Sequence, residues 1–145
     1  MPNENPRLFF EDVKYSLEKI SYKTLRSVSS DKEVEMKPLD EYKVQSLDFE
    51  KIVITVTRTI SFEPKSHFSL SVEAGLFLPL TQNERKFVGS LDELNNYTIT
   101  HIDTIINNSS LMETISLLIS QISSSYGRVP IITPPIFVGP ENVKK

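Results

Sequence analysis

The residues that could carry acid–base chemistry are few in this sequence. It has two histidines, His67 and His101, and no cysteine. His101 lies two positions before Asp103, and a histidine oriented by a carboxylate can act as a general base. No serine stands in a Gly-x-Ser-x-Gly context that would supply the matching nucleophile. We therefore interpret His101 as an ordinary surface or hydrogen-bonded histidine and predict that the chain is not an enzyme.

Sites for nucleotides and metals are no better supported. The glycines, at positions 75, 89, 127 and 139, are too scattered for a phosphate-binding loop. Without cysteine, a metal site would depend on carboxylates, which cluster at 31–35 and at Asp40 and Glu41. Lys32 and Lys37 alternate with them, and mixed signs of this kind are typical of a solvated face or loop. We predict no metal site and no cofactor.

The charge balance argues against a nucleic-acid partner. Sixteen Lys and Arg stand against 19 Asp and Glu, which gives a net charge of −3. A protein that grips a phosphate backbone needs a positive surface. The basic pairs Arg85-Lys86 and Lys144-Lys145 are too short to provide one. We predict no nucleic-acid binding.

Length and composition indicate one folded domain, expected in the cytoplasm. The chain has 145 residues, of which 39% are hydrophobic and 24% charged, a balance typical of globular proteins. We find no export signal at the N-terminus, and no apolar run approaches the ~20 residues that a membrane helix needs. We expect a single domain over residues 1–145, with flexible ends at 1–7 and 139–145.

Among the secondary-structure elements that would position a site, a pair of strands gives the clearest signal. Residues 52–62 and 68–78 alternate between two faces and contain many β-branched side chains, which is typical of strands with one solvated face. A short turn at 63–66 makes the two an antiparallel hairpin. Gly75 within the second strand indicates a bulge or a close approach by another backbone.

Two further strands precede this hairpin. The apolar residues of 15–22 fit either a helix or a strand with one irregularity near Lys19, and we favour the strand. Tyr42, Val44 and Ser46 indicate a shorter strand. The sequence thus predicts about four strands, mostly consecutive and antiparallel.

The C-terminal third changes to a helical period. Leu111, Met112 and Ile115 begin an apolar stripe that continues to residue 122. The sequence 110–113 has the form of a capping box, and Gly127 suits a left-handed C-cap. A second capping box at 90–93 indicates a short helix before Tyr97. Strands followed by helices make an α+β pattern.

The second face of the 110–122 helix is almost without charge. It carries Thr114, Ser116, Ser120 and Gln121, where a surface helix usually has Lys and Glu. We therefore expect a partner subunit to cover this face, with Ser116, Ser120 and Gln121 in the oligomer interface.

Several segments, in order along the chain, resemble the export chaperone SecB. The 15–22 segment resembles the first strand of that family, including its irregular spacing, and 72–77 resembles the last strand. Residues 105–137 resemble the end of SecB, where a helix closes with Gly-x-x-Pro, here 127–130, and an apolar, Pro-containing segment ends in Phe137. Together these segments cover most of the chain.

The resemblance implies both a fold and a function. The fold is α+β, a four-stranded antiparallel sheet with a long C-terminal helix, and a possible short helix, packed on one face. The family forms dimers that pair sheets and tetramers that stack through the long helices. It holds unfolded or extended polypeptides in apolar grooves without ATP. The candidate groove residues, each with a core position as the alternative, are Tyr22, Phe62, Leu76, Phe77, Ile131, Ile136 and Phe137.

The sequence also departs from the family. Positions that are acidic in SecB, and that dock on the translocase motor, align here with Lys19, Lys23 and Leu70. Because reversed charges repel a partner chosen for the original sign, we do not expect motor binding. The segment 91–108 departs from the SecB pattern as well. The alternative hypothesis is a SecB-fold adaptor for one specific protein, as in relatives that guard antitoxins.

Overall fold

The fold is a four-stranded antiparallel sheet with helices gathered on one face. The computed structural model describes residues 13–24, 35–63, 68–80, 89–125 and 130–138, and every structural statement here concerns those residues. The spatial order of the strands is β1-β4-β3-β2, and all neighbours are antiparallel. The strands are β1 (Lys14–Thr24), β2 (Glu35–Leu47), β3 (Lys51–Glu63) and β4 (Phe68–Pro79).

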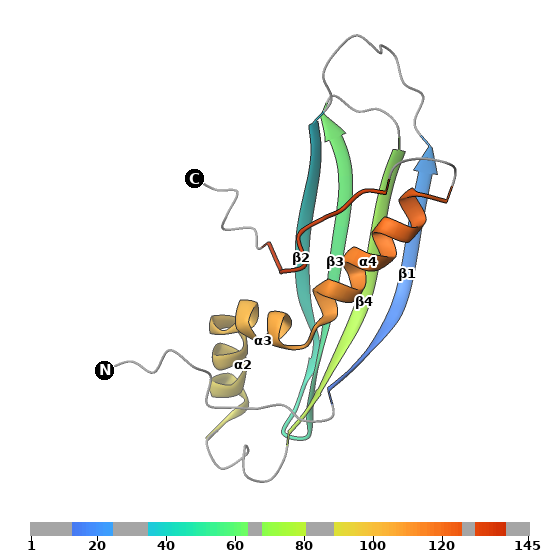
Figure 1. The fold of residues 1–145 in the computed structure, drawn as a ribbon. Helices are drawn as coiled ribbons and strands as arrows, with labels where there is room; N and C mark the ends of the chain where they lie inside the picture. Colours follow the sequence, from blue (N-terminus) through green and yellow to red (C-terminus); the bar gives the residue numbers. More distant parts are fainter. Residues whose placement is uncertain (1–12, 25–34, 64–67, 81–88, 126–129, 139–145) are drawn as a thin grey trace.

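Three helices occur in the described part of the chain: α2 (Leu91–Thr100), α3 (Ile102–Asn108) and α4 (Leu111–Ser123). In Figure 1, α4 crosses the sheet over β4, while the extended residues 130–138 run from the end of α4 across β3 towards β2. Buried residues of all three helices join one core on one face of the sheet. The predicted α+β class and sheet are therefore confirmed.

The alternating pattern of β3 and β4 builds the sheet side of this core. Ile52, Ile54, Val56 and Ile60 of β3 are fully buried, and the alternate residues of β4 are buried against the same helices. The two strands pair in continuous register from Lys51 to Ile60. The predicted hairpin is correct, while its turn at 64–67 lies outside the described residues.

The predicted irregularity near Lys19 is a bulge in β1. The register with β4 shifts between Leu17 and Lys19, so Glu18 has no partner of its own. The Glu18 carboxylate then lies over Gly75, where an added Cβ would stand 3.0 Å from Oε2. The close approach that Gly75 indicated is therefore made by a side chain from the bulged strand rather than by a backbone.

Strand β2 is longer than the sequence predicted. It begins at Glu35 rather than near Tyr42 and pairs with β3 along its whole length. Two residues on its inner face, Pro38 and Asp40, interrupt the apolar alternation. The first part of the strand was therefore not predicted. Proline is tolerated here because β2 is an edge strand. The interpretation of Asp40 as part of a solvated face is wrong, since its side chain is fully buried.

Helices α2 and α4 begin where the sequence predicted, but only α2 is capped in the predicted way. The predicted box at 90–93 is formed in its serine half: Ser90 Oγ accepts from the Glu93 N–H at 3.1 Å. The Glu93 carboxylate accepts from the N–H of Gly89, one residue before the N-cap, at 2.8 Å. Helix α4 begins at Leu111 as predicted, but Ser110 makes no side-chain cap. Only two residues separate α3 from α4, and Ser110 adopts a left-handed φ of 67° instead of the extended N-cap conformation. The predicted C-cap at Gly127 lies outside the described residues.

The core face of α4 is as predicted, whereas α3 was not foreseen. Leu111, Met112, Ile115 and Ile119 are buried. Helix α3 buries Ile102, Ile105 and Ile106, but no side chain caps its start. It therefore has no local start signal. Helices α2 and α3 together make up the segment that departs from the SecB pattern.

Candidate functional site

Two of the predicted groove residues lie together at one end of the sheet. Tyr22 of β1 and Phe62 of β3 are half-buried, and both contact Phe68 of β4. The Tyr22 and Phe68 rings stack with centroids 5.2 Å apart, and the Phe62 ring meets Phe68 edge to face at 5.2 Å. These rings are partly open to solvent on the helical face.

Leu76 and Phe137 lie inside the molecule. Leu76 is 0% exposed and Phe137 4% exposed, and both belong to the core on the helical face. The Phe137 ring meets Tyr42 of β2 edge to face, with centroids 6.1 Å apart. Neither side chain reaches a ligand unless the segment that covers it moves.

Phe77 lies on the other face of the sheet. It pairs across the strands with Lys14 and Val53, and the neighbouring residues Leu76 and Leu78 point into the core. A hollow of about 670 Å³ surrounds it, lined by Lys14, Tyr15, Ser16, Lys51, Phe77 and Pro79. The predicted groove residues are thus distributed over two faces and the core, and the groove assignment stays a prediction.

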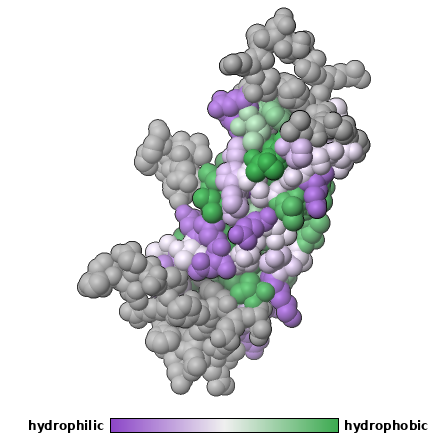
Figure 2. Space-filling view, viewed as in Figure 1, coloured by the Kyte–Doolittle hydropathy of each residue, from purple (hydrophilic) through white to green (hydrophobic). Residues whose placement is uncertain are grey.

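Ile131 and Ile136 belong to residues 130–138, which we call the C-terminal strap. Ile131 is half-buried against the core. Ile136 is 54% exposed, and Ile132, which follows Ile131, is 72% exposed. Figure 2 shows hydrophobic patches separated by polar ones on the face that carries α4 and the strap. The strap thus presents apolar side chains outward while it covers the core beneath it.

A buried ion pair that the sequence analysis missed holds the strap. Arg58 of β3 and Asp40 of β2 are opposite each other in the strand register, and both are 0% exposed. The guanidinium donates from Nε to Asp40 Oδ1 and from Nη2 to Asp40 Oδ2, each at 2.6 Å. The signal available in the sequence was a charged residue at an inner position of each of two strands.

The remaining contacts of this pair go to the strap. Arg58 Nη1 donates to Thr133 Oγ1 at 2.9 Å and to the carbonyl oxygen of Pro134. Its Nη2 donates to the Ile136 carbonyl at 2.8 Å. The Val138 N–H donates to Asp40 Oδ2 at 2.7 Å. Buried charges of this kind need such a complete set of partners, and the strap takes part in four of the six hydrogen bonds of the pair.

Helix residues hold the strap from the other side. Ser116 of α4 donates to the Thr133 carbonyl at 2.8 Å. The Phe137 N–H donates to Asn107 Oδ1 of α3 at 2.7 Å. The Ile131 N–H donates to Ser123 Oγ at 2.8 Å. The strap is therefore fixed between β2, β3 and the helices mainly through its main chain.

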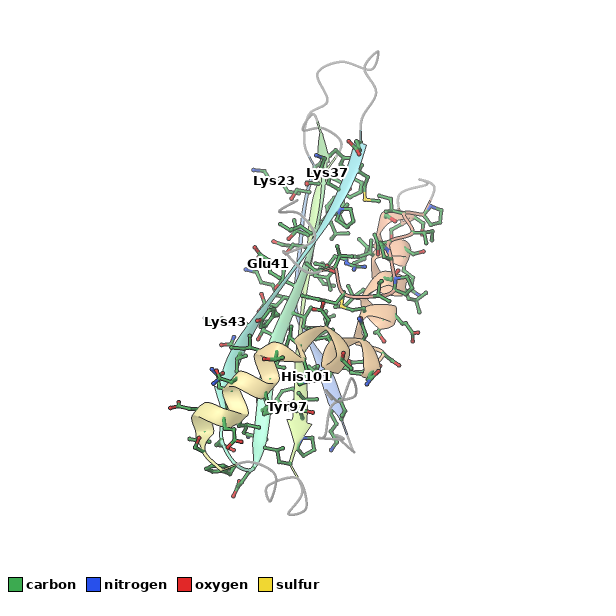
Figure 3. All side chains as sticks on the ribbon, turned by 90° about the vertical axis from the view of Figure 1, so that its left-hand side faces the viewer. Lys23, Lys37, Glu41, Lys43, Tyr97 and His101 are labelled. Carbon is green, nitrogen blue, oxygen red and sulfur yellow. The ribbon has the colours of Figure 1, made fainter. Side chains whose placement is uncertain are left out.

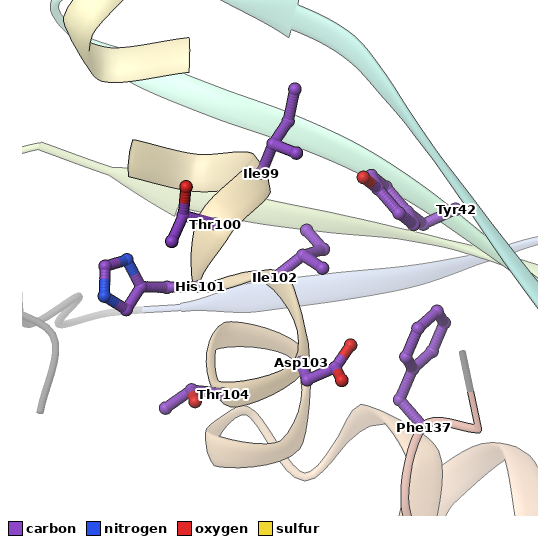
Figure 4. A pocket seen from close by; sticks show the side chains of 8 residues that line it. All are labelled: Tyr42, Ile99, Thr100, His101, Ile102, Asp103, Thr104 and Phe137. Atoms are coloured by element: carbon purple, nitrogen blue, oxygen red, sulfur yellow. The ribbon is translucent and has the colours of Figure 1, made fainter. Parts of the chain in front are cut away.

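His101 and Asp103 border a cavity of about 350 Å³ between the α2–α3 junction, β2 and the strap. Figure 4 shows the two side chains pointing away from each other on opposite sides of the helical turn. His101 Nδ1 lies 3.1 Å from the Tyr97 carbonyl, and its ring lies 4.4 Å from the Tyr97 ring. The histidine is thus hydrogen-bonded to its own helix, and Asp103 does not orient it. The other histidine, His67, lies outside the described residues.

The predicted oligomer interface on α4 contains residues with contacts inside the chain. Ser116 is half-buried by its bond to the strap, and Ser120 is half-buried as well. Gln121 is exposed, and beside it Leu117 is 60% exposed. Leu117 makes this face more apolar than the three predicted polar residues indicate. The interface itself stays a prediction.

The positions aligned with the motor-docking face of SecB separate in the structure. Leu70 is fully buried on the helical face, so its placement on the outer face is wrong. Lys19 and Lys23 are exposed on the opposite face, where they pair with Glu73 and Ser69. Figure 3 shows Lys23 there, on the side of the sheet away from α4, with Glu41 and Lys43 of β2.

The part of the chain that the structure describes shows neither a metal-binding cluster nor a membrane-spanning helix. No group of three or more His, Asp or Glu side chains gathers where it could hold a metal ion. No helix in the described ranges is long and apolar enough to cross a membrane.

The comparisons with known proteins support the fold. No protein-family model matches the sequence, and no curated protein matches it. A solved structure of the Mycobacterium tuberculosis Rv1957 SecB-like chaperone, in complex with a ChAD peptide from the Rv1956 HigA1 antitoxin, superposes with a TM-score of 0.60. It is 11% identical, and the match covers 87% of this chain and 88% of that one. A protein of unknown function from Streptococcus agalactiae has a TM-score of 0.39 at 13% identity, with coverage of 88% and 99%. This chain therefore has a SecB-like fold.

Proposed function

We propose that this chain binds unfolded or extended polypeptide and holds it, without ATP and without chemistry of its own, as SecB-like chaperones do. The SecB-like fold supports this proposal at the level of architecture. The described residues offer no catalytic constellation that competes with it. Fold alone does not decide function, so the surface has to supply the rest of the argument.

The observation that carries the proposal is the apolar inner face of the edge strand β1. Tyr15, Leu17 and Ile20 pair with Leu76, Ala74 and Val72, and so they point to the helical side of the sheet. There they remain exposed by 41%, 54% and 40%, because α4 covers β4 more than β1. Apolar residues that continue along one strand in this way are typical of a binding surface rather than of scattered exposure.

Two half-buried aromatic residues of this side extend the surface. Tyr22 and Phe62 continue it towards the end of the sheet. An edge strand also offers free main-chain groups to an extended chain, and such pairing is sequence-tolerant. We propose Tyr22 and Phe62, with Tyr15, Leu17 and Ile20, as the wall that contacts the polypeptide.

The test is a matched pair of charge insertions. Leu17→Asp places a carboxylate on the proposed wall, and we expect affinity for a permanently unfolded protein to fall about tenfold. Leu39→Asp is the control, because Leu39 is also an exposed leucine on an edge strand, at 41%, but lies on the opposite face. Equal losses in both variants, with circular dichroism unchanged, would show that the polypeptide does not bind at β1.

A second candidate function is a dedicated adaptor for one protein. It is favoured by Lys19 and Lys23 on the outer face. A partner that docks on acidic residues, as the translocase motor docks on SecB, would be repelled by these two lysines. The antitoxin peptide bound by the mycobacterial neighbour is a precedent for a specific client. An adaptor would form a complex of fixed stoichiometry with one partner and would ignore generic unfolded chains.

We further propose that the protein works as an oligomer in the cytoplasm. The exposed face of α4 carries Leu117 and Gln121, with Glu113 as its charged residue at the start of the helix. Covering this face with a second subunit would remove Leu117 from water and leave the apolar wall of β1 as the open surface.

A further inference from the structure

The C-terminal strap is bound in the way an extended ligand would be bound. Three of its carbonyl groups, those of Thr133, Pro134 and Ile136, accept from side chains of the body. The N–H groups of Ile131, Phe137 and Val138 donate to side chains of the body. Contacts with main-chain groups select for an extended conformation of the bound segment and place few requirements on its amino-acid sequence.

Arg58 is the centre of this arrangement, and all of its donors are used. A guanidinium has five N–H groups. Two of them bind Asp40, and the other three bind the Thr133 hydroxyl and the Pro134 and Ile136 carbonyls. If the strap leaves and nothing replaces it, three donors of a buried cation lose their protein partners, and Asp40 Oδ2 keeps only its bond from Arg58. Such groups are costly to leave unpaired, so the site favours an occupant.

The side chains of the strap contribute little to its selection. Ile132, Pro134, Pro135 and Ile136 are exposed, while Thr133 and Phe137 are buried at 2% and 4% exposure. Phe137 enters the core beside Tyr42 and borders the 350 Å³ cavity at the α2–α3 junction. The site thus takes an extended main chain, one hydroxyl side chain at the position of Thr133 and one large apolar side chain at the position of Phe137. The cavity beside Phe137 leaves room for a larger side chain there.

We propose that Arg58, Asp40, Ser116 and Asn107 form a receptor for extended main chain, and that a client segment replaces the strap in it. This inference rests on the proposed function and adds a second site to the wall on β1, at the other side of α4. The client supplies a Ser or Thr hydroxyl, carbonyls at the next position and two residues beyond it, then a large apolar residue, then an N–H. Exchanging the strap for a segment of this kind keeps every donor of Arg58 paired. Ile131, Ile136 and Phe137 then belong to the resident occupant rather than to the wall of the groove.

Hydrogen exchange of the wild-type protein tests the replacement directly. The Phe137 and Val138 amides are hydrogen-bonded to Asn107 and Asp40 while the strap is seated. With a permanently unfolded protein at saturation, we expect these two amides to exchange at least about tenfold faster. Exchange that is unchanged or slower, with the client demonstrably bound, would overturn the replacement.

A disulfide lock provides a second, independent test. Ser116 Oγ and Thr133 Oγ1 are 3.2 Å apart, so side chains at these two positions contact each other, and an S–S bond of ~2.05 Å needs a further approach of the two atoms. The natural chain contains no cysteine that could compete. We expect oxidised Ser116→Cys/Thr133→Cys to bind the unfolded protein at least about tenfold more weakly than its reduced form. Each single substitution is the control: it removes a hydrogen bond of the strap, but its affinity should be the same with and without the oxidant.

The outcomes separate the two proposals. Equal affinity of the oxidised and reduced double variant would overturn the receptor while leaving the β1 wall in place. If wild-type protein binds no unfolded chain at all, the proposed function fails, and the receptor fails with it.

Discussion

At the scale of single residues, the Asp40–Arg58 pair is the feature on which the helical face depends. Both side chains are fully buried, and the pair joins β2, β3 and the strap. A buried pair contributes little net stability compared with apolar residues, but removing one partner leaves an uncompensated charge. The pair is therefore best understood as a device that positions the strap.

The first prediction follows from this asymmetry. Arg58→Met should lower the free energy of unfolding by about 3–5 kcal/mol, because the Asp40 carboxylate stays buried without its cation. The double variant Asp40→Leu/Arg58→Met should recover much of that loss. Urea denaturation followed by circular dichroism measures both, and Lys43→Met, on the exposed outer face of β2, is the control. A single-variant loss no larger than the control's would contradict the account.

At the scale of elements, helices α2 and α4 differ in how the N–H groups of their first turns are capped. Ser90 caps α2 with its side chain, while Ser110 before α4 stands in a left-handed conformation and makes no cap. A serine pays a steric cost in that conformation that a glycine does not.

Substitutions at these two serines should therefore act in opposite directions. Ser90→Ala should destabilise the protein by about 1 kcal/mol, because an N-cap bond is lost. Ser110→Gly should stabilise it by about 1 kcal/mol, because the strain is relieved. Thermal unfolding of the two variants beside wild type checks the signs. A destabilising Ser110→Gly would show that Ser110 does not hold this conformation in solution.

The elements also show what the sequence can and cannot predict. The β3–β4 hairpin and the stripe of α4 follow local periodicity, and both were predicted. The predicted β2 was too short because Pro38 and Asp40 break its apolar alternation. The residues that accommodate them, Ile60 and Arg58, lie on β3 and not near them in the sequence. Helix α3 has no side-chain cap and gives no start signal.

The candidate site around the strap was harder to predict than the elements for a related reason. Its contacts join residues far apart in the chain: the bond from Arg58 to Ile136 spans 78 positions. Periodicity can say that Leu76 and Phe77 point to opposite faces, and the structure confirms it. It cannot say which face a terminal segment will cover. The prediction therefore gathered aromatic residues that the fold separates.

At the scale of the whole molecule, one face of the sheet is only partly covered. Helix α4 and the strap cover β4, β3 and β2, while the inner face of β1 keeps its apolar residues in contact with water. A chain that only needed a stable core would gain by covering or replacing them. The proposed binding of extended polypeptide would give this exposure a use.

The measurement that tests this central claim most directly is a calorimetric titration with a permanently unfolded protein, with the same protein in its folded form as the control. The account predicts micromolar or tighter binding of the unfolded form, on the order of −8 kcal/mol, and no heat from the folded one. Absence of binding to the unfolded form would contradict the account and leave the SecB-like fold as architecture, with a single cognate partner still to be found.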